Sequence, residues 1–533
     1  MEFSIIAICN RSVTIERNNK SIYETEVPCR LLLNGNVVKE TTQNVITLYG
    51  LTPDTEYELG MDTVSDNAPV GRRFKKRFRT KPESILLDVR SFGAVGDGEH
   101  NDTAALQAAI LACPENGTVW LPKGTYYSGP LFFKSNMTFW VDEWATLLGD
   151  TDRSHYPVLP GMVRNLYHND EEYNIASWEG NPLDCFASLI TALNVQNLDI
   201  IGEGTIDGNA QNGDWWVNPK VKRTAWRPNT VFIAHSKYVR MQGLAVQNSP
   251  TWTIHPYYSD HVAFMNLTIT NPSDSPNTDG FDPESCVDVL LLGTKISVGD
   301  DCIAIKSGKL YMARHHHRET RNVTIRNCCL ERGHGSVTVG SEVAGGVSGL
   351  FVKQCIFSQT DRGVRIKTRR GRGDRSVLTD LTFEDIRMDH VHMPVTVNMF
   401  YYCDPDGHSG YVQDQNEQPV DYRTPYIGHL KIKDVECSGV DSSFVCAYGL
   451  PEAPIGRLTL KRVRVSFLPE EERISKCPIM MDDFPEMNGK GMFLKNVTAL
   501  EIEDVEIKGS ADKKADLENV PEQDISNLLF EDL

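Results

Sequence analysis

The sequence predicts an all-β protein in which a long parallel β-helix follows a small β-sandwich. An apolar repeat of the form Φ-x-Φ-x-x-Φ-x-Φ, where Φ is apolar, starts at residues 239, 262, 287, 323, 350 and 381, and the same phrase returns at 430, 458 and 500. The first six starts lie 23 to 36 residues apart. Strand alternation that returns at such intervals is typical of a solenoid, in which each coil packs its apolar side chains on the next. Because the β-runs are short and few helical patterns separate them, the solenoid is predicted to be a parallel β-helix.

A small β-sandwich is predicted over residues 1–82, ahead of the β-helix over residues 86–533. Short alternating β-runs are separated there by turn residues, and Asn34-Gly35 between two apolar runs is a hairpin signal. The stretch Leu51–Tyr57 resembles the tyrosine-corner segment of fibronectin type III sandwiches. We expect a fibronectin type III-like domain that packs on or extends the β-helix, with carbohydrate binding by this domain as the alternative.

A short helix is predicted near the start of the β-helix. Asp102 can cap it, and the apolar residues at 105, 106, 109 and 110 fall on one face at helical spacing. The open end of a solenoid exposes its apolar core to water, so we expect this helix to cover that end.

Four short clusters carry the residues that could do chemistry, and they fall in four successive repeats. They are Asn277-Thr278-Asp279, Gly299-Asp300-Asp301, Gly333-His334-Gly335 and Arg365-Ile366-Lys367. Together they supply three carboxylates, one imidazole and two fixed cations. These groups suffice to protonate a leaving oxygen, activate a water and hold an anionic substrate. Because equivalent positions of neighbouring coils lie about 4.8 Å apart, the clusters are predicted to meet on one face.

These clusters, in this order, resemble the polygalacturonase family, glycoside hydrolase family 28. The Asn-Thr-Asp, Gly-Asp-Asp, Gly-His-Gly and Arg-Ile-Lys motifs of that family are all intact here, and the resemblance runs from about Asp88 to the C-terminus. It implies a right-handed parallel β-helix of the pectin lyase-like kind. It also implies inverting hydrolysis of α-1,4-galacturonosidic bonds in polygalacturonate or oligogalacturonides.

The resemblance implies a role for each acidic residue. Asp300 would be the general acid, Asp279 and Asp301 would hold the attacking water, and His334 would tune and orient the acid. Three clustered carboxylates should raise the pKa of one of them, which suits an acid that must stay protonated. The alternative is that these aspartates are ordinary turn residues at the bends of a β-helix.

Arg365 and Lys367 lie two residues apart and therefore point to the same side of a strand. A uronic acid carboxylate would give both cations a partner through charge-assisted hydrogen bonds. The resemblance implies that they grip the galacturonate around the scissile bond, with Asn277 as a further substrate-binding residue. A structural salt bridge to the acidic cluster is the alternative.

Four further features are interpreted more simply. The arginines at 369, 370, 372 and 375 are expected to form a solvated basic loop. The family places a tyrosine downstream of Arg-Ile-Lys near the leaving group, and adjacent Tyr401 and Tyr402 leave its identity open. The Trp-rich insert over 214–226 is assigned no role. His315-His316-His317 is expected in a surface loop, because no Cys or Glu stands at metal-ligand spacing.

Composition describes an ordinary globular protein, with 40% hydrophobic and 24% charged residues. The net charge of −18 argues against a nucleic-acid partner, which requires a basic surface. The thirteen cysteines include no CxxC pair. Cys328, Cys355 and Cys437 are predicted to share one phase of the repeat as reduced core residues, a usage that suits a reducing compartment. We expect no cofactor and no metal ion.

The N-terminal residues lack a basic region, and no run is long enough to span a membrane. We therefore expect a cytoplasmic protein without a membrane partner, or a secreted one if a signal peptide has been removed. Without a visible export signal, short oligogalacturonides and exo action are favoured. Hydrolysis of rhamnogalacturonan or another decorated pectin is the nearest alternative, and calcium-dependent elimination and a non-enzymatic glycan-binding β-helix are more distant ones.

Overall fold

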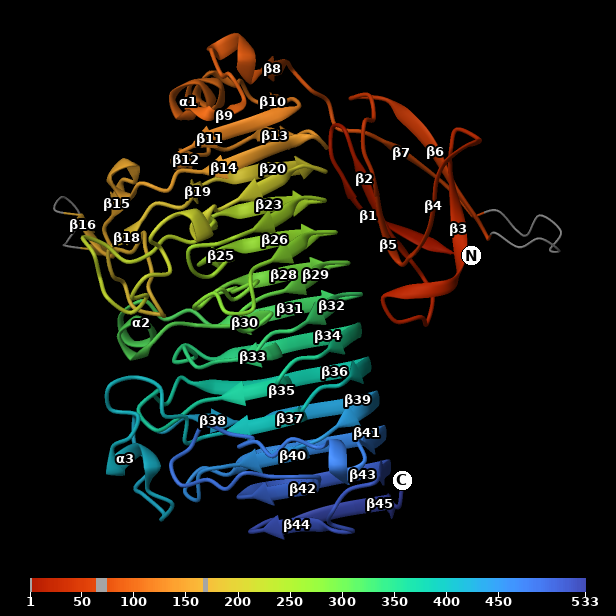
Figure 1. The fold of residues 1–533 in the computed structure, drawn as a ribbon, viewed down its shortest axis with the longest axis vertical. Coiled ribbons are helices and arrows are strands. Elements are labelled where there is room, and N and C mark those ends of the chain that lie inside the picture. The colour runs from red at the N-terminus through yellow and green to blue at the C-terminus, as the bar shows by residue number, and fades with distance from the viewer. Residues whose placement is uncertain (1, 64–73, 166–170) are drawn as a thin grey trace.

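The computed structural model describes residues 2–63, 74–165 and 171–533. Figure 1 shows a tall stack of strands that runs from β10 to β45, with a separate pair of small sheets on one flank. The predicted fold, a parallel β-helix preceded by a β-sandwich, is confirmed. Within the described residues, no helix is both long and apolar enough to span a lipid bilayer.

The N-terminal sandwich consists of two antiparallel sheets around one apolar core. Tyr57 Oη accepts a hydrogen bond from the Thr52 backbone N–H at 2.9 Å, which is the contact expected of a tyrosine corner. Assignment to the fibronectin type III class stays a prediction. In sheet order, the strands are β1 (Phe3–Ile8), β2 (Val13–Arg17) and β5 (Val45–Leu48), then β4 (Asn36–Gln43), β3 (Glu24–Leu33), β6 (Glu56–Thr63) and β7 (Phe74–Arg79).

Three faces make up the β-helix, and each strand pairs in parallel with the equivalent strand of the next coil. The first face contains β8 (Leu86–Asp88), β10 (Gly117–Leu121), β13 (Met137–Val141), β20 (Gln196–Gly202), β23 (Lys237–Gln242), β26 (Asp260–Met265), β28 (Val287–Leu292) and β31 (Thr320–Arg326). The second contains β9 (Asp97–Asn101), β11 (Gly124–Ser128), β14 (Ala145–Gly149), β21 (Thr205–Asp207), β24 (Ala245–Gln247), β27 (Thr268–Thr270), β29 (Lys295–Ser297) and β32 (Cys329–Glu331).

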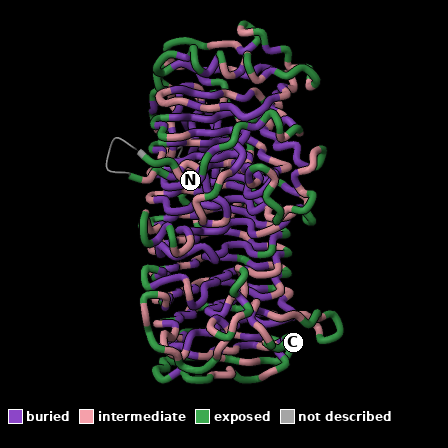
Figure 2. Tube along the Cα trace, turned by 90° about the vertical axis from the view of Figure 1, so that its left-hand side faces the viewer, coloured by how far each residue is buried: buried purple, intermediate pink, exposed green. Residues whose placement is uncertain are grey.

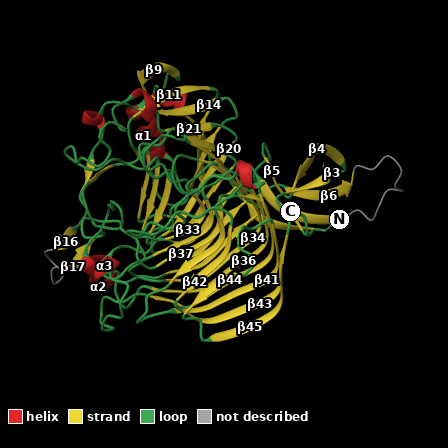
Figure 3. Cartoon of the chain, turned by 60° about the horizontal axis from the view of Figure 1, so that its bottom comes forward, coloured by secondary structure: helices red, strands yellow, loops and turns green. Residues whose placement is uncertain are grey.

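Toward the C-terminus the first two faces merge into long strands that form one curved wall (Figure 3). These are β34 (Val347–Ser358), β36 (Val377–Asp389), β39 (His429–Val440), β41 (Ile455–Phe467), β43 (Val497–Lys508) and β45 (Glu522–Glu531). The third face contains β12 (Leu131–Phe132), β19 (Ile190–Leu193), β22 (Val231–Ala234), β25 (Ile254–Tyr257), β30 (Ile303–Ile305), β33 (Gly335–Val339), β35 (Arg362–Lys367), β37 (Met393–Asn398), β40 (Ser443–Tyr448), β42 (Lys490–Lys495) and β44 (Ala515–Glu518). Phe281 bridges β25 to β30 and makes this third face continuous.

The remaining elements are short and lie in the connections. They are η1 (Val89–Phe92), η2 (Arg153–His155), η3 (Ala210–Asn212), η4 (Glu470–Glu472), β15 (Val158–Leu159), β16 (Val163–Asn165), β17 (Glu171–Tyr173), β18 (Cys185–Phe186), β38 (Tyr426–Ile427), α2 (Leu310–His315) and α3 (Gly410–Gln413). Figures 1 and 3 both place β16, α2 and α3 on the flank of the β-helix away from the sandwich, and Figure 3 shows β17 beside β16.

The repeat read from the sequence matches the strand register, with one correction. Val262 pairs with Val289, Val289 with Val323, and Val323 with Leu350. Val287 was therefore the wrong repeat start by two residues, because it lies half-buried at the strand entrance while Val289 is the buried core residue.

Each repeat bends at one position that accepts few residue types. The fifth position of each repeat has a positive φ, and it is glycine, asparagine or aspartate in most coils. These residues enter the left-handed region at the lowest cost. The bend residues are Gly243, Asn266, Gly293, Asn327, Gln354, Asp385, Asp434, Arg462 and Asp504.

The core is a single cluster of buried apolar side chains along the β-helix. Figure 2 shows that buried residues continue along the stack of coils. Each fully buried phenylalanine, such as Phe264, Phe357 or Phe383, contributes about 1.5–3 kcal/mol. All thirteen cysteines are free. Cys328 contacts Cys355 as predicted, but Cys437 does not share their phase. It pairs in register with Met388, two residues beyond the position that corresponds to Cys355.

Helix α1 (Thr103–Ala112) lies at the N-terminal end of the stack (Figure 1) and buries Leu106, Ala109 and Ile110. The predicted cap is only partly right. Asp102 precedes the helix, but its carboxylate accepts hydrogen bonds from the backbone N–H groups of Val95 and Gly96, at 2.7 and 2.9 Å, rather than from the helix.

The sandwich packs on the side of the β-helix. Of the two expected arrangements, packing on the β-helix and extending it, the first is the one found. Ala7 and Val45 join an apolar cluster with Met265 and Leu292 of the coils. Polar contacts surround that cluster. Arg326 donates hydrogen bonds to Glu16 at 2.7 and 3.1 Å, and other polar pairs across the contact include Asn44 with Asn327 and Lys81 with Asp199.

Candidate active site

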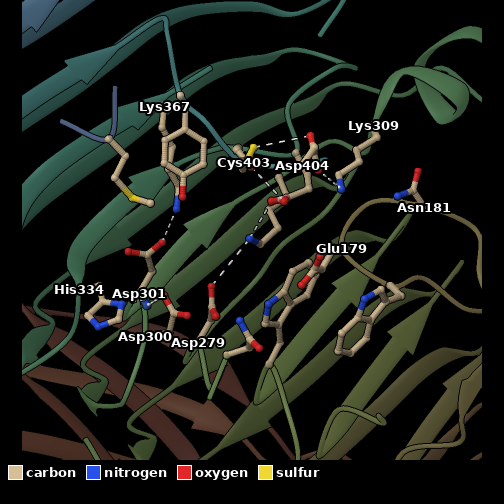
Figure 4. Close-up of a pocket in the computed structure, with 18 of the residues that line it drawn as sticks. Glu179, Asn181, Asp279, Asp300, Asp301, Lys309, His334, Lys367, Cys403 and Asp404 are labelled. Carbon is tan, nitrogen blue, oxygen red and sulfur yellow. Dashed lines mark hydrogen bonds and ion pairs between the residues drawn. The ribbon is translucent and has the colours of Figure 1, made fainter. Parts of the chain in front are cut away.

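A cavity of about 810 Å³ lies on the third face of the β-helix (Figure 4). All seven residues predicted from the sequence line it, namely Asn277, Asp279, Asp300, Asp301, His334, Arg365 and Lys367. Its lining residues run from Trp178 to Met480, so none belongs to the sandwich.

Strand register brings the first clusters together. Asp300 and Asp301 lie just before β30, and His334 lies just before β33, which pairs with β30 in parallel. Asp300 and His334 each lie 11 residues beyond Val289 and Val323, which are partners in register. The backbone N–H of His334 donates to the Asp300 carbonyl at 3.0 Å.

The cations come from the next strand. In β35, Val364 and Ile366 belong to the core, so Arg365 and Lys367 face outward. Asn277 lies before Phe281 on the neighbouring coil, and its Oδ1 accepts a hydrogen bond from Arg227 Nη2 at 2.8 Å.

Asp279, Asp300 and Asp301 form a compact trio, with one oxygen of each within 4.8 Å of the others. Asp279 and Asp301 are buried, whereas the Asp300 side chain is 23% exposed. Asp300 is therefore the member of the trio that a molecule in the cavity can reach most easily.

Asp301 is held by both cations. Arg365 Nη1 lies 2.9 Å from Asp301 Oδ1, and Lys367 Nζ lies 2.9 Å from Oδ2. This is the ion pair considered as the structural alternative, and the same cations also line the cavity. Burial would raise the pKa of Asp301, but Lys367 and Arg365 outweigh it and hold the pKa well below its usual range. Asp301 is accordingly ionised.

Asp279 carries the raised pKa that the clustering predicted. Burial and the adjacent Asp300 raise the pKa of Asp279 to about 8. The fully buried Asp282 lies close by, and burial together with Asp279 raises its pKa far above the usual range. These shifts favour protonation of Asp279 and Asp282.

Asp300 interacts with His334 instead. His334 Nδ1 lies 3.3 Å from Asp300 Oδ1. Burial would raise the pKa of Asp300, but the hydrogen bond from His334 outweighs it and lowers the pKa. The same contact raises the pKa of His334, which favours the charged imidazolium.

Lys306 also lines the cavity, although none of the four sequence clusters contains it. Its Nζ lies 3.1 Å from Glu342, 3.8 Å from Asp279 and 3.7 Å from Asp282, and 4.1 Å from the centre of the Trp252 ring. The signal was strand alternation, because Ile303 and Ile305 of β30 point into the core and leave Lys306 on the cavity side.

Of the two tyrosines considered, only Tyr401 is among the described residues that line the cavity. Tyr401 lines the cavity and lies over Lys367, with 5.3 Å from Nζ to the ring centre. Tyr402 stacks on His408 instead. In the Trp-rich insert, Trp226 lines the cavity and stacks on Trp178 at 4.6 Å, whereas Trp215 is fully buried.

Arginines 369, 370 and 372 are buried, so the expected solvated loop was wrong for them and right only for Arg375. Acidic residues from distant segments account for the burial. Arg370 pairs with Glu452 at 2.6 Å, and Arg372 pairs with Asp404 at 2.9 Å.

One turn crosses to the cavity from the segment between β17 and β18. Trp178 and Asn181 pair with each other, and the carbonyl of Gly180 accepts a hydrogen bond from Lys309 N at 2.9 Å. Gly180 has φ +75°, and a methyl group there would lie 2.9 Å from Glu342 Cβ. Only glycine therefore fits this approach without displacement.

A second segment borders the cavity from the C-terminal coils. Arg362 Nε donates to the Pro478 carbonyl at 3.0 Å, and Asn398 donates to the Met480 carbonyl at 3.0 Å. Met480 itself lines the cavity beside Arg365, with 3.3 Å between Sδ and Nη2. The cavity thus has walls contributed by chain segments on both sides of the catalytic cluster.

The surface loop expected for histidines 315–317 is only partly right, because His315 is the last residue of helix α2. His316 Nε2 lies 3.2 Å from Glu172, and His317 Nε2 lies 3.1 Å from the Gly345 carbonyl. The spacing of the aspartate trio would allow a metal ion, but both oxygens of Asp301 are already bound by Arg365 and Lys367.

Comparison with known proteins gives matches over both parts of the β-helix. The family model described as Glycosyl hydrolases family 28 matches residues 169–415, and the model described as Rhamnogalacturonase A/epimerase, pectate lyase-like, matches residues 86–151. A probable polygalacturonase of Vitis vinifera is 28% identical over 393 residues, which is 72% of this chain and 74% of the relative. An exopolygalacturonase of Arabidopsis thaliana is 29% identical over 329 residues, 59% of this chain and 67% of the relative.

Solved structures share the fold. A family 28 exopolygalacturonase of Yersinia enterocolitica aligns over 100% of this chain and 98% of its own, with a TM-score of 0.62 and 18% identity. An exopolygalacturonase of Thermotoga maritima aligns over 76% of this chain and 94% of its own, with a TM-score of 0.59 and 23% identity.

Proposed function

This chain belongs to glycosyl hydrolases family 28, and from that premise we propose that it hydrolyses α-1,4-galacturonosidic bonds of polygalacturonate or oligogalacturonides. The observation that carries the proposal is the aspartate trio beside Arg365 and Lys367 in one cavity. One carboxyl group can protonate the leaving oxygen and another can activate a water. The two cations suit a substrate that carries a carboxylate at every sugar.

Asp300 is the proposed general acid. It is the most exposed of the three carboxyls, and His334 orients it. A galacturonate carboxylate bound at Arg365 and Lys367 adds negative charge beside the trio, which raises the pKa of Asp300 and favours its protonated form. The proton then passes from Asp300 to the glycosidic oxygen as the bond to the anomeric carbon breaks.

Asp279 and Asp301 are the proposed water-holding pair. One of them accepts a proton from the water as its oxygen attacks the anomeric carbon, so that one water is consumed and two saccharides are released. Inverting enzymes usually place their carboxyl groups about 6.5–9.5 Å apart, and the spacing within 4.8 Å here is shorter. Inversion is therefore proposed from family membership and not from this distance.

The cavity shape favours exo action. The turn at Gly180 and the segment at Met480 border the cavity from either side, and Trp178 and Trp226 add an aromatic wall. Such a site suits the end of a chain better than its middle. Exopolygalacturonases among the curated relatives support the same choice.

The test is Asp300→Asn with trigalacturonate as substrate, with products separated by size. Turnover should fall by roughly 10²–10⁴-fold because the proton donor is lost, while the dissociation constant for trigalacturonate changes little. Asp288→Asn on the outer side of the same coil, where Asp288 pairs with His261, should keep full turnover. Undiminished turnover in Asp300→Asn would refute the proposed acid, and products that absorb as unsaturated sugars would indicate elimination instead.

A further inference from the structure

A second charged cluster borders the cavity, apart from the catalytic trio. Three cations converge there on the carboxylate of Asp404. Lys309 Nζ lies 2.7 Å from Oδ1, while Arg372 Nη1 and Arg369 Nη2 lie 2.9 and 3.5 Å from Oδ2. Figure 4 shows Lys309 and Asp404 together on the cavity wall, away from Asp279, Asp300 and Asp301.

The cluster has more positive than negative charge to offer a ligand. Asp404 shares its one charge among the three cations, and the exposed Asp406 takes only Arg369, at 2.6 Å. Glu342, the next carboxylate along the wall, already pairs with Lys306. Burial alone would raise the pKa of Asp404, but Arg372 and Lys309 outweigh it and hold the pKa at about 2.

The two arginines are anchors that water cannot reach. Arg369 and Arg372 are 5% and 3% exposed, and several of their nitrogens have no hydrogen-bond partner among the described residues. Their charge is therefore poorly screened, which fixes Asp404 and through it Lys309.

Lys309 is the member of the cluster that can bind a ligand. An ammonium group has three donors, and among the described residues Asp404 is the one partner found for Lys309 Nζ. Its side chain is 15% exposed and lines the cavity. The backbone N–H of Lys309 also donates to the Gly180 carbonyl, so Lys309 lies beside the crossing turn that borders the cavity.

We propose that Lys309 binds the carboxylate of the uronate residue at this side of the cavity, with Asp404 and Arg372 as positioning residues. The proposal rests on the function proposed above. It assigns this carboxylate to a subsite distinct from the one at Arg365 and Lys367. A carboxylate is favoured over a hydroxyl because a charge-assisted hydrogen bond in a partly buried site is about twice as strong as a neutral one.

The test removes the two partners of the proposed ion pair separately, the positive charge from the enzyme and the negative charge from the substrate. Trigalacturonate is compared with two analogues in which galactose replaces galacturonate at one end or at the other. Wild-type enzyme should prefer trigalacturonate over one of these analogues by about 10- to 100-fold in kcat/KM. Lys309→Met should abolish that preference by raising KM for trigalacturonate. The kcat for trigalacturonate and the kcat/KM for the disfavoured analogue should stay nearly unchanged.

Lys309→Arg should recover part of the preference, which would exclude a folding defect as the cause. Asp404→Asn should raise KM for trigalacturonate less than Lys309→Met does, with kcat kept. Lys237→Met is the control, because Lys237 pairs with Asp260 and does not line the cavity. An equal loss on all three substrates in Lys309→Met, or no loss, would overturn the proposal. Failure of the wild type to cleave trigalacturonate would instead refute the proposed function.

Discussion

At the scale of single residues, the site is governed by which carboxyl holds a proton. The three aspartates have different surroundings: Asp301 is fixed as an anion by Arg365 and Lys367, Asp300 is paired with His334, and Asp279 is buried. Burial therefore raises the pKa of Asp279, whereas the two cations lower the pKa of Asp301. Identical side chains thus take different states because of what contacts them.

This charge distribution predicts the pH dependence of kcat/KM. Catalysis needs one proton on the trio, and the raised pKa of Asp279 keeps that proton bound up to about pH 8 before substrate binds. Substrate binding then transfers it to Asp300, which leaves Asp279 and Asp301 as the ionised pair that holds the water. Activity should therefore persist through neutral pH and fall about tenfold per pH unit above pH 8, as the proton is lost. Initial rates on trigalacturonate across the range give the profile, and circular dichroism over the same range shows whether the fold is intact. An alkaline fall already near the ordinary carboxyl pKa would contradict this assignment.

Residues within the four clusters could be predicted because each cluster is contiguous in the sequence. Lys306 and Lys309 lie outside these clusters: strand alternation could have placed Lys306 on the cavity side, but the partners of both lysines could not be predicted. Lys306 depends on Glu342, and Lys309 depends on Asp404 and Gly180. Those partners are 36 to 129 residues away in the chain, and no pattern in a single sequence reports such pairs.

At the scale of single elements, the turn at Gly180 sets the shape of the cavity. Replacing Gly180 with alanine forces a left-handed backbone on a residue with a Cβ and also brings that Cβ against Glu342, 2.9 Å away. The turn should move off the cavity wall. We expect longer oligogalacturonides among the early products of polygalacturonate, which chromatography by size would detect.

Gly50→Ala provides the control for that experiment. Gly50 has φ +70°, but nothing lies within 4 Å of an added Cβ. It should lose roughly 1–2 kcal/mol of stability from the backbone strain alone, without any change in products. The role of the turn would be disproved if both variants gave the same products as the wild type.

Strand elements were more predictable than their connections. Apolar alternation located the strands of the coils, and only the start at Val287 was displaced, because a half-buried valine two residues early mimics the core position. The buried arginines were misjudged for a different reason. Their partners Glu452 and Asp404 lie in distant loops, and a run of arginines alone is indistinguishable from a solvated one.

At the scale of the whole molecule, the sandwich is attached by a specific polar contact. Glu16 is mostly buried and accepts hydrogen bonds from Arg326 and Asn327. Arg326→Met would leave this carboxylate with one partner, and we expect a loss of about 1–3 kcal/mol in the free energy of unfolding. Denaturation monitored by circular dichroism would measure it.

The exposed pair of Arg30 and Glu40 within the sandwich is a matched control for that change. Arg30→Met should cost less than about 1 kcal/mol, since exposed ion pairs contribute little. Equal effects of the two substitutions would indicate that the contact between sandwich and β-helix is not important for stability.

The overall architecture was predictable from repetition, because a solenoid reuses one pattern for every coil. The packing of the sandwich against coils hundreds of residues away was only one of two expected arrangements. Its contacts join Glu16 to Arg326 and Ser12 to Gln242, which are pairings between unrelated segments. Neither segment carries a local pattern that specifies the other.

In the proposed mechanism, Asp279 and Asp301 direct a water to the anomeric carbon from the face opposite the leaving group, which Asp300 protonates. Proton NMR of trigalacturonate, recorded in the first minutes after wild-type enzyme is added, measures the anomer of the newly formed reducing end. The account predicts the β-anomer first, with the α-anomer appearing only by slow mutarotation. Initial formation of the α-anomer would show retention and contradict it.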